Sequence, residues 1–189
     1  WYTYLVSEVL KMKVLSITSR TITLELENNL PFYAEQEFEI YINGNLYKKE
    51  RRNVFTIFNL SPNTSYTIQV EKEKKIIKTK GESLCLNVKD FYAVGNGVEE
   101  DTVKIQAAIA ACPKNGCVYI PKGVYFISAL FLKSDMTIYM EKDAKLIAKY
   151  DRGAYPILPQ EQQGYIFGTW EGSLVDCFAS SITALNCSN

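Results

Sequence analysis

Histidine is absent from this chain of 189 residues, and the chain also has few cysteines, no excess of either charge and no long apolar run. Without histidine there is no Ser-His or Cys-His nucleophile pair, and the commonest general base and metal ligand is missing. Chemistry by this chain alone would have to use carboxylates, lysine, tyrosine or cysteine. We therefore expect no metal site and no cofactor.

The charges balance, with 21 Lys+Arg against 21 Asp+Glu. Binding to nucleic acid or to an anionic membrane surface needs a basic excess, so neither is predicted as a partner. The apolar runs fall far short of the roughly 20 residues that span a bilayer. Residues 1–10 lack a basic start and contain Glu8, so they do not have the pattern of a signal peptide.

Five cysteines are too few for a disulfide-built scaffold. Cys112 and Cys117 are separated by four residues, a spacing at which a disulfide could close a small loop. Two buried or exposed thiols are the alternative at this pair. A structural zinc site is not predicted, because the sequence has neither a Cys-x-x-Cys pair nor a Cys/His cluster.

Residues 11–80 predict a β-sandwich of about six or seven short strands without a helix. Apolar and polar residues alternate in several short runs, as in half-buried strands. Asn43-Gly44 predicts a hairpin turn, because both positions need a positive φ. The clearest predicted strands are residues 19–27, 38–42, 54–58, 64–70 and 75–79.

Residues 60–66 read Leu-Ser-Pro-Asn-Thr-Ser-Tyr and resemble a signature of fibronectin type III domains. In that family the tyrosine, here Tyr66, forms a corner in which its hydroxyl bonds to nearby backbone. Leu26 departs from the pattern, because the family usually has a core tryptophan on this strand. Such domains carry no chemistry and usually space, stabilise or present a neighbour.

The pattern changes after a linker at residues 81–86. Residues 101–112 predict the one helix, with Asp101 as its N-cap and Pro113 ending it. Its predicted apolar stripe consists of Val103, Ile105, Ala108 and Ile109.

Very short strands separated by turns follow this helix, up to residue 148. Strands this short cannot bury a face alone, but stacked coils of a solenoid can. We therefore predict that residues 87–189 begin a β-helix whose first coil is capped by the helix. The predicted strands are residues 117–120, 124–127, 129–132, 136–140 and 145–148.

Three segments carry a resemblance to a known family. Residues 86–97 resemble the opening segment of pectin-active right-handed parallel β-helix enzymes. Residues 118–125 read Val-Tyr-Ile-Pro-Lys-Gly-Val-Tyr and resemble one of their coils. Residues 129–144 resemble a coil of glycoside hydrolase family 28, the polygalacturonases. A fibronectin-like domain ahead of the β-helix is similar to the bacterial exo-acting members, so the chain resembles the N-terminal part of such an enzyme.

The resemblance implies a hydrolase that cleaves α-1,4-galacturonan with inversion, using one carboxylic acid and one carboxylate base on opposite sides of the bond. In that family the acids lie in Asn-Thr-Asp and Asp-Asp motifs, supported by Gly-His-Gly and Arg-x-Lys segments. This sequence contains none of these motifs; none of its six aspartates follows Asn-Thr or adjoins another. We therefore expect no catalytic residue here, an inactive chain, and coils that continue beyond residue 189.

The carboxylates that are present have structural explanations. We expect Asp101 to act as a helix cap, and Asp135 and Asp143 to be turn residues at coil corners. Residues 150–169 predict a long irregular loop, of a length that is often functional.

This loop and the residues after it supply the candidate substrate-binding residues, which are Arg152, Tyr155, Trp170 and Glu171. Aromatic rings stack on sugar faces, and an arginine can pair with the carboxylate of galacturonate. Packing within the coil or against the sandwich is the competing explanation for the same residues.

Two other functions remain open beside the polygalacturonase. The chain could be a carbohydrate-binding or spacer module, or part of a β-helical adhesin or tailspike. The expected partner in the full-length protein is pectin or oligogalacturonide. Self-association through the open end of the β-helix is a further expectation, because the last coil would expose an apolar face and an unpaired edge. The family resemblance favours a secreted or periplasmic protein over a cytoplasmic one.

Overall fold

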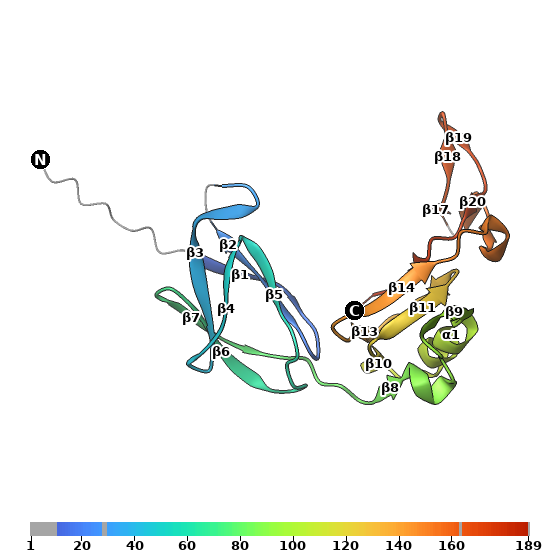
Figure 1. Ribbon diagram of the computed structural model, residues 1–189. Helices are drawn as coiled ribbons and strands as arrows, with labels where there is room; N and C mark the ends of the chain where they lie inside the picture. Colours follow the sequence, from blue (N-terminus) through green and yellow to red (C-terminus); the bar gives the residue numbers. More distant parts are fainter. Residues whose placement is uncertain (1–10, 28–29, 163, 189) are drawn as a thin grey trace, which may run out of the picture. The chain divides into compact units, whose positions relative to one another are not determined.

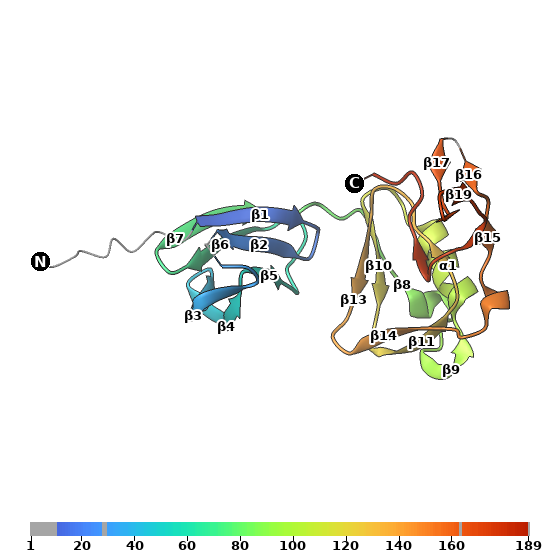
Figure 2. The ribbon, with the colours of Figure 1, turned by 90° about the horizontal axis from the view of Figure 1, so that it is seen from above.

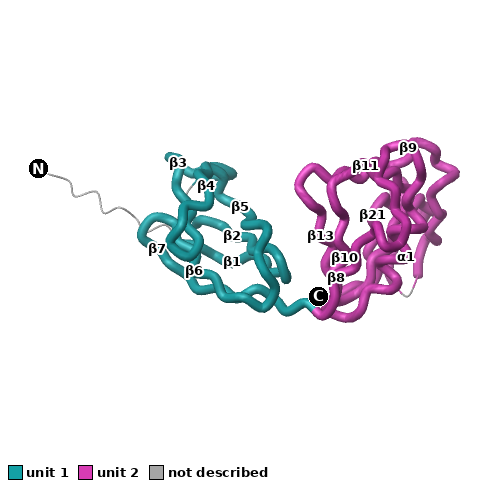
Figure 3. Tube along the Cα trace, turned by 60° about the horizontal axis from the view of Figure 1, so that its bottom comes forward, with its two compact units in different colours: residues 1–82 teal, residues 83–189 magenta. Residues whose placement is uncertain are grey.

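The computed structural model describes residues 11–27, 30–162 and 164–188. The predicted lack of a signal peptide concerns residues 1–10, which lie outside these ranges. The chain divides into two compact units, Trp1–Glu82 and Ser83–Asn189, coloured separately in Figure 3. In the described ranges no helix is long and apolar enough to cross a membrane.

The first unit consists of two antiparallel sheets (Figure 1). One sheet has the strand order β1-β2-β5 and the other has the order β4-β3-β6-β7. The strands are β1 Lys11–Ile17, β2 Ile22–Glu27, β3 Tyr33–Ile42, β4 Asn45–Arg52, β5 Val54–Ile57, β6 Ser65–Val70 and β7 Glu73–Lys78.

Side chains from both sheets form one core in this unit. Leu24 and Ile57 from the first sheet and Ile40 and Ile68 from the second are fully buried in the same cluster. Leu26 is also in this core, at the position where the fibronectin pattern has a tryptophan. Strand periodicity explains the arrangement, because alternate residues of each strand point to the same face.

Turn chemistry sets the hairpins of this unit. Asn43 and Gly44 have φ values of 50° and 84°, as predicted for the turn between β3 and β4. The Ser61 N–H donates to the Tyr66 hydroxyl over 2.8 Å, which is the backbone contact expected of a tyrosine corner. The assignment of this unit to the fibronectin type III family stays a prediction.

The second unit stacks short parallel strands in register. Two three-stranded sheets have the orders β13-β10-β8 and β14-β11-β9, and Figure 2 shows them as two walls of the coil. Val118 of β10 lies beside Ile138 of β13, and Tyr125 of β11 lies beside Leu146 of β14. The strands are β8 Cys85–Asn87, β9 Asn96–Glu100, β10 Gly116–Ile120, β11 Gly123–Ile127, β13 Met136–Met140 and β14 Ala144–Ala148.

A third wall is shorter. It pairs β12 (Leu130–Phe131) in parallel with β21 (Ile182–Thr183), so residues 52 positions apart in the chain meet one coil apart. The 3-10 helix η1 (Val88–Phe91) and the helix α1 (Thr102–Ala111) complete the start of the unit. Ile105, Ala108 and Ile109 of α1 are buried in the same core as Val118 and Tyr125.

Two details of the predicted helix were wrong. Val103 is 79% exposed and is not part of the buried stripe; Thr102 is buried instead. Asp101 stands at the N-cap position, but its side chain makes no capping hydrogen bond. The predicted end is confirmed: α1 stops at Ala111, and Cys112 is extended with ψ 123° because a proline follows it.

The sequence prediction missed the structure of two segments. Strand β9, which begins at Asn96, was not among the predicted strands. The long loop at residues 150–169 was expected to be irregular, but it contains a 3-10 helix and short strands that form antiparallel pairs. These elements and their partners are η2 Arg152–Ala154, β15 Ile157–Leu158, β16 Glu161–Gln162, β17 Tyr165–Ile166, β18 Thr169–Trp170, β19 Ser173–Leu174 and β20 Cys177–Phe178.

The last coil of parallel strands is more open than the one before it. Ile120 is fully buried, whereas its register partner Met140 is 37% exposed. Tyr125 is fully buried, and its partner Leu146 is half-buried. Within the described ranges, β13 and β14 each have a paired strand on one side only.

Candidate functional site

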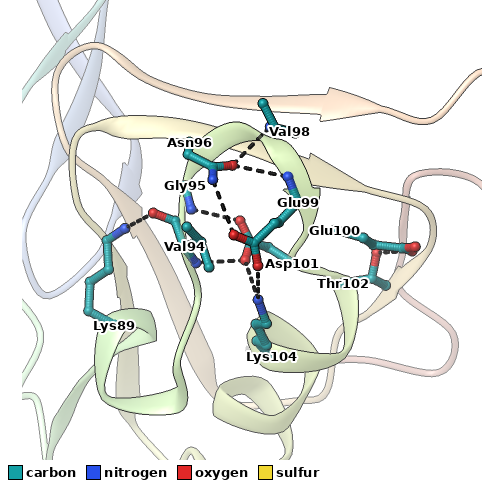
Figure 4. Close-up of polar contacts among 10 residues, drawn as sticks. All are labelled: Lys89, Val94, Gly95, Asn96, Val98, Glu99, Glu100, Asp101, Thr102 and Lys104. Atoms are coloured by element: carbon teal, nitrogen blue, oxygen red, sulfur yellow. Dashed lines mark hydrogen bonds and ion pairs between the residues drawn. The ribbon is translucent and has the colours of Figure 1, made fainter.

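Asp101 is the most buried carboxylate of the second unit, with no exposed surface. Its two oxygens accept hydrogen bonds from the N–H groups of Val94 and Gly95, over 2.7 and 2.8 Å (Figure 4). The Lys104 ammonium lies 3.3 Å from the same carboxylate. Asp101 therefore ties the loop before β9 to the start of α1, and it is not the helix cap that the sequence predicted.

The loop that Asp101 holds is closely packed. Gly95 has a φ of 63°, and a Cβ there would lie 2.8 Å from the ring of Tyr125 and 2.9 Å from the ammonium of Lys89. Lys89 sits over the Tyr125 ring at 5.0 Å and donates to the Val94 carbonyl over 2.5 Å. No room is left for a ligand against this face of Tyr125, so the Asp101 cluster is structural.

Asp135 and Asp143 stand at coil corners, as predicted, with positive φ values of 55° and 69°. Their carboxylates lie 3.3 Å from the Lys114 ammonium and 3.7 Å from the Lys122 ammonium, respectively. Asx side chains tolerate the left-handed region, which is what these corners require.

Glu141 lies at the same corner as Asp143, and no role was predicted for it. It accepts from the Lys122 N–H over 2.8 Å and from the Tyr119 hydroxyl over 2.9 Å, and these bonds lower the pKa of its carboxyl. Tyr119 in turn stacks on Tyr139, with 5.8 Å between ring centres. Sequence distance hid this contact, because Tyr119 and Glu141 meet only when one coil lies on the next.

The structure places the four predicted substrate-binding residues on two separate elements. Arg152 is exposed in η2, and the hydroxyl of nearby Tyr155 donates to the Lys149 carbonyl over 2.9 Å. Trp170 and Glu171 lie at the tip of the β18–β19 hairpin, where Glu171 has a φ of 49°. Among the residues that the structure describes, no hydrogen bond or ion pair joins the two groups.

The hairpins of residues 157–178 instead present an apolar surface of their own. Trp170 is 70% exposed, Tyr165 56% and Ile166 58%. Exposed aromatic rings can stack on the apolar faces of sugars, so Trp170 and Tyr165 are able to contact such a ligand. Which of the four predicted residues contact substrate stays a prediction.

Among described residues, every carboxyl with a displaced pKa is displaced downward. The pKa of Glu100 is lowered by Lys149, and that of Glu141 by its bonds to Lys122 and Tyr119. A general acid for glycoside hydrolysis needs the opposite shift. The arrangement of Glu100 and Glu141 is that of structural ion pairs and hydrogen bonds.

Cys112 and Cys117 are both buried. The choice between a disulfide and two thiols at this pair stays a prediction. Cys112 ends α1, whereas Cys117 lies in β10 and pairs in register with Cys85 of β8.

Residues 85–149 match the family described as "Rhamnogalacturonase A/epimerase, pectate lyase-like". An exo-poly-α-D-galacturonosidase of Dickeya chrysanthemi is 38% identical over 71 residues, which are 38% of this chain and 12% of that protein. The plasmin and fibronectin-binding protein A of Streptococcus pneumoniae is 35% identical over 96 residues, 49% of this chain and 13% of that protein. The chain thus spans a small part of both relatives.

The fold extends the likeness beyond the matched sequence. The structure of a family 28 exopolygalacturonase of Yersinia enterocolitica superimposes with a TM-score of 0.64 and 24% identity. The superposition covers 94% of this chain and 37% of that one. The predicted all-β architecture with a β-helix of the family 28 kind is confirmed at this level; the capping role of α1 stays a prediction.

Proposed function

Because the chain is related to pectate lyase-like proteins and shares the fold of a family 28 exopolygalacturonase, we propose that it is the N-terminal, non-catalytic part of a polygalacturonase-like glycoside hydrolase. The observation that carries the proposal is the sequence match to the Dickeya exo-poly-α-D-galacturonosidase. The substrate of the whole protein would be α-1,4-galacturonan, cleaved with inversion.

Two parts of this chain support a role without catalysis. Five carboxylates of the second unit are engaged in ion pairs or hydrogen bonds, namely those of Glu100, Asp101, Asp135, Glu141 and Asp143. The first unit would act as a fibronectin type III-like spacer, and α1 would cap the β-helix. Catalytic acids would then have to come from coils beyond residue 189.

Purified 189-residue protein incubated with polygalacturonate tests the proposal directly. We expect no release of reducing ends above that of a protein-free control. A polypeptide that continues from residue 189 into coils with paired aspartates should release galacturonate. Turnover by the 189-residue protein, or inactivity of the longer polypeptide on galacturonan, would contradict the proposal.

A second candidate, a β-helical adhesin, is favoured by the match to the pneumococcal plasmin and fibronectin-binding protein. The same experiment separates the two functions, because an adhesin would remain inactive on galacturonan in the longer form as well. Binding of that longer form to plasmin or fibronectin would then favour the adhesin.

A further inference from the structure

An open groove of about 900 Å³ lies in the first unit, and the proposed function does not use it. It runs across the ends of both sheets, from Lys13 and Glu25 in one sheet to Tyr33 and Arg52 in the other. Tyr33 and Arg52 are register partners on neighbouring strands. Phe32, the residue immediately before β3, also lines the groove.

Phe32 has a backbone conformation that a bulky residue rarely adopts. Its φ is 70°, and the N–H of Tyr33 donates to the carbonyl of Pro31 over 2.9 Å, which closes a γ-turn around it. Turns of this positive-φ kind are rare and strained. The ring gains little burial in return, because Phe32 is 79% exposed. Strain of this kind is concentrated at functional sites in proteins.

Asn53 holds the strained turn in place. This buried residue donates from its backbone N–H to the Phe32 carbonyl over 2.8 Å, and from its side-chain amide to the Leu30 carbonyl over 2.6 Å. The backbone carbonyl of Asn53 accepts from Leu26 of β2 over 2.9 Å. The exposed ring is therefore displayed by a rigid support.

The side chain of Arg52, which lines the groove with Phe32 and Tyr33, is also held in place by hydrogen bonds. Its Nε and Nη2 donate to the two oxygens of Glu50 over 3.2 and 3.0 Å. Arg52 and Lys48 hold the pKa of Glu50 well below its usual range, so the orienting carboxylate stays ionised. The arginine side chain is 64% exposed, and its remaining nitrogen, Nη1, has no partner among the described residues.

We propose that this groove binds a uronate unit of an acidic polysaccharide, with the sugar ring on Phe32 and its carboxylate on the open side of Arg52. The proposal rests on the proposed function for the choice of an acidic sugar. A flat apolar face beside a fixed guanidinium suits a ring that bears a carboxylate, because arginine pairs geometrically with that group. Tyr33 extends the apolar surface, and Lys13 lies there 3.9 Å from the Glu25 carboxylate with which it pairs. Glu25 and Glu27 can accept hydrogen bonds from sugar hydroxyls.

Affinity electrophoresis of the whole 189-residue protein in polygalacturonate gels, with isothermal titration of oligogalacturonide, tests the groove. Phe32→Gly and Arg52→Gln should each weaken binding by about tenfold, the effect of one lost charge-assisted contact or its equivalent. Phe58→Ala and Lys49→Gln are matched controls on the same sandwich and should bind as the parent does. Highly methyl-esterified pectin, which lacks the charge, should bind more weakly than polygalacturonate.

Phe32→Gly also separates binding from folding. Glycine adopts a φ of 70° without strain, and the lost ring is mostly exposed, so the unfolding temperature should stay the same or rise. A variant that is as stable as the parent but binds weakly supports the proposal. Parent-like binding by Phe32→Gly and Arg52→Gln would overturn it.

Other outcomes are equally decisive. Absence of any binding by the parent protein would overturn the proposed groove site. Binding that is lost in Trp170→Ala but kept in Phe32→Gly and Arg52→Gln would also overturn it, because the sugar would then lie on the hairpins of the second unit. Neither result touches the proposed hydrolase, which is judged by galacturonate release from the longer polypeptide.

Discussion

At the scale of single residues, Asp101 shows how one side chain can hold two segments. An N-cap serves one helix end, but this carboxylate bonds the backbone of Val94 and Gly95 and pairs with Lys104. Its burial means that water cannot replace any of these partners.

Substitution of Asp101 by Asn separates the two roles. Asn caps helices about as well as Asp, so a simple cap would lose almost nothing. As an anchor, the amide would turn a donor toward at least one N–H or toward Lys104, and we expect a loss of about 2–4 kcal/mol in the free energy of unfolding. Urea unfolding measures the loss, and hydrogen exchange assigns it to residues 83–188.

Asp90→Asn provides the control, because Asp90 is exposed in η1 and should change the free energy of unfolding by less than about 0.5 kcal/mol. Equal stability of the Asp101 and Asp90 variants would show that the carboxylate contacts contribute nothing.

The sequence predicted the turn residues at the coil corners correctly, but it did not predict the side chains that hydrogen-bond between coils. Asp135 and Asp143 were recognisable as turn residues because their role depends on their own backbone. The hydrogen-bonding roles of Gln106 and Glu141 could not be recognised from the sequence, because the partners of these two side chains come from other coils.

At the scale of elements, α1 lies beside β12 where a β-helix would otherwise have the strand of a preceding coil. Gln106 donates to the Phe131 carbonyl over 3.0 Å and accepts from the Phe131 N–H over 2.8 Å. This is the pair of bonds that a neighbouring strand would make. One turn earlier, the Thr102 hydroxyl accepts from the Ser128 N–H over 2.8 Å. These contacts support the proposed capping role of the helix.

Replacing Gln106 by Leu keeps the size of the side chain and removes both bonds. The N–H and carbonyl of Phe131 then lose their partners at a strand edge, and we expect the free energy of unfolding to fall by about 1–3 kcal/mol. Hydrogen exchange at Phe131 should accelerate in the same variant.

Val103→Ala on the same helix is the comparison, because Val103 is 79% exposed and the change should be within about 0.5 kcal/mol. An unchanged exchange rate at Phe131 in Gln106→Leu would mean that the helix does not protect this edge.

At the scale of the whole molecule, the open end of the β-helix dominates the expected behaviour in solution. We define this end as Ile138, Met140 and Leu146, which continue the rows of the buried Val118, Ile120 and Tyr125. Unpaired strand edges with apolar neighbours recruit other chains. We predict that the 189-residue protein self-associates through this end in a concentration-dependent manner.

Sedimentation equilibrium of two lysine variants tests this prediction. Met140→Lys places a charge on the open end and should weaken association by about tenfold or more, the cost of burying a poorly paired charge. Ile147→Lys is the control, because Ile147 is 38% exposed and Met140 is 37% exposed. Ile147 pairs in register with Phe126 on the outer face of the coil, so a lysine there should leave association unchanged. A parent protein that stays monomeric at every concentration would refute the prediction.

The sequence by itself determined most strands of the sandwich and of the stacked coils, the Asn43-Gly44 turn and the family likeness, because alternation, turn residues and short apolar runs are local properties of the chain. Tertiary structure alone decided what Asp101, Gln106 and Glu141 bond to, that Val103 faces solvent, and that Phe32 is held exposed beside Arg52. Gln106 and Glu141 bond to residues 19 to 25 positions away, which only coil stacking brings close. Asp101 bonds to residues near it in the chain, but through a loop conformation that the residue types alone do not specify.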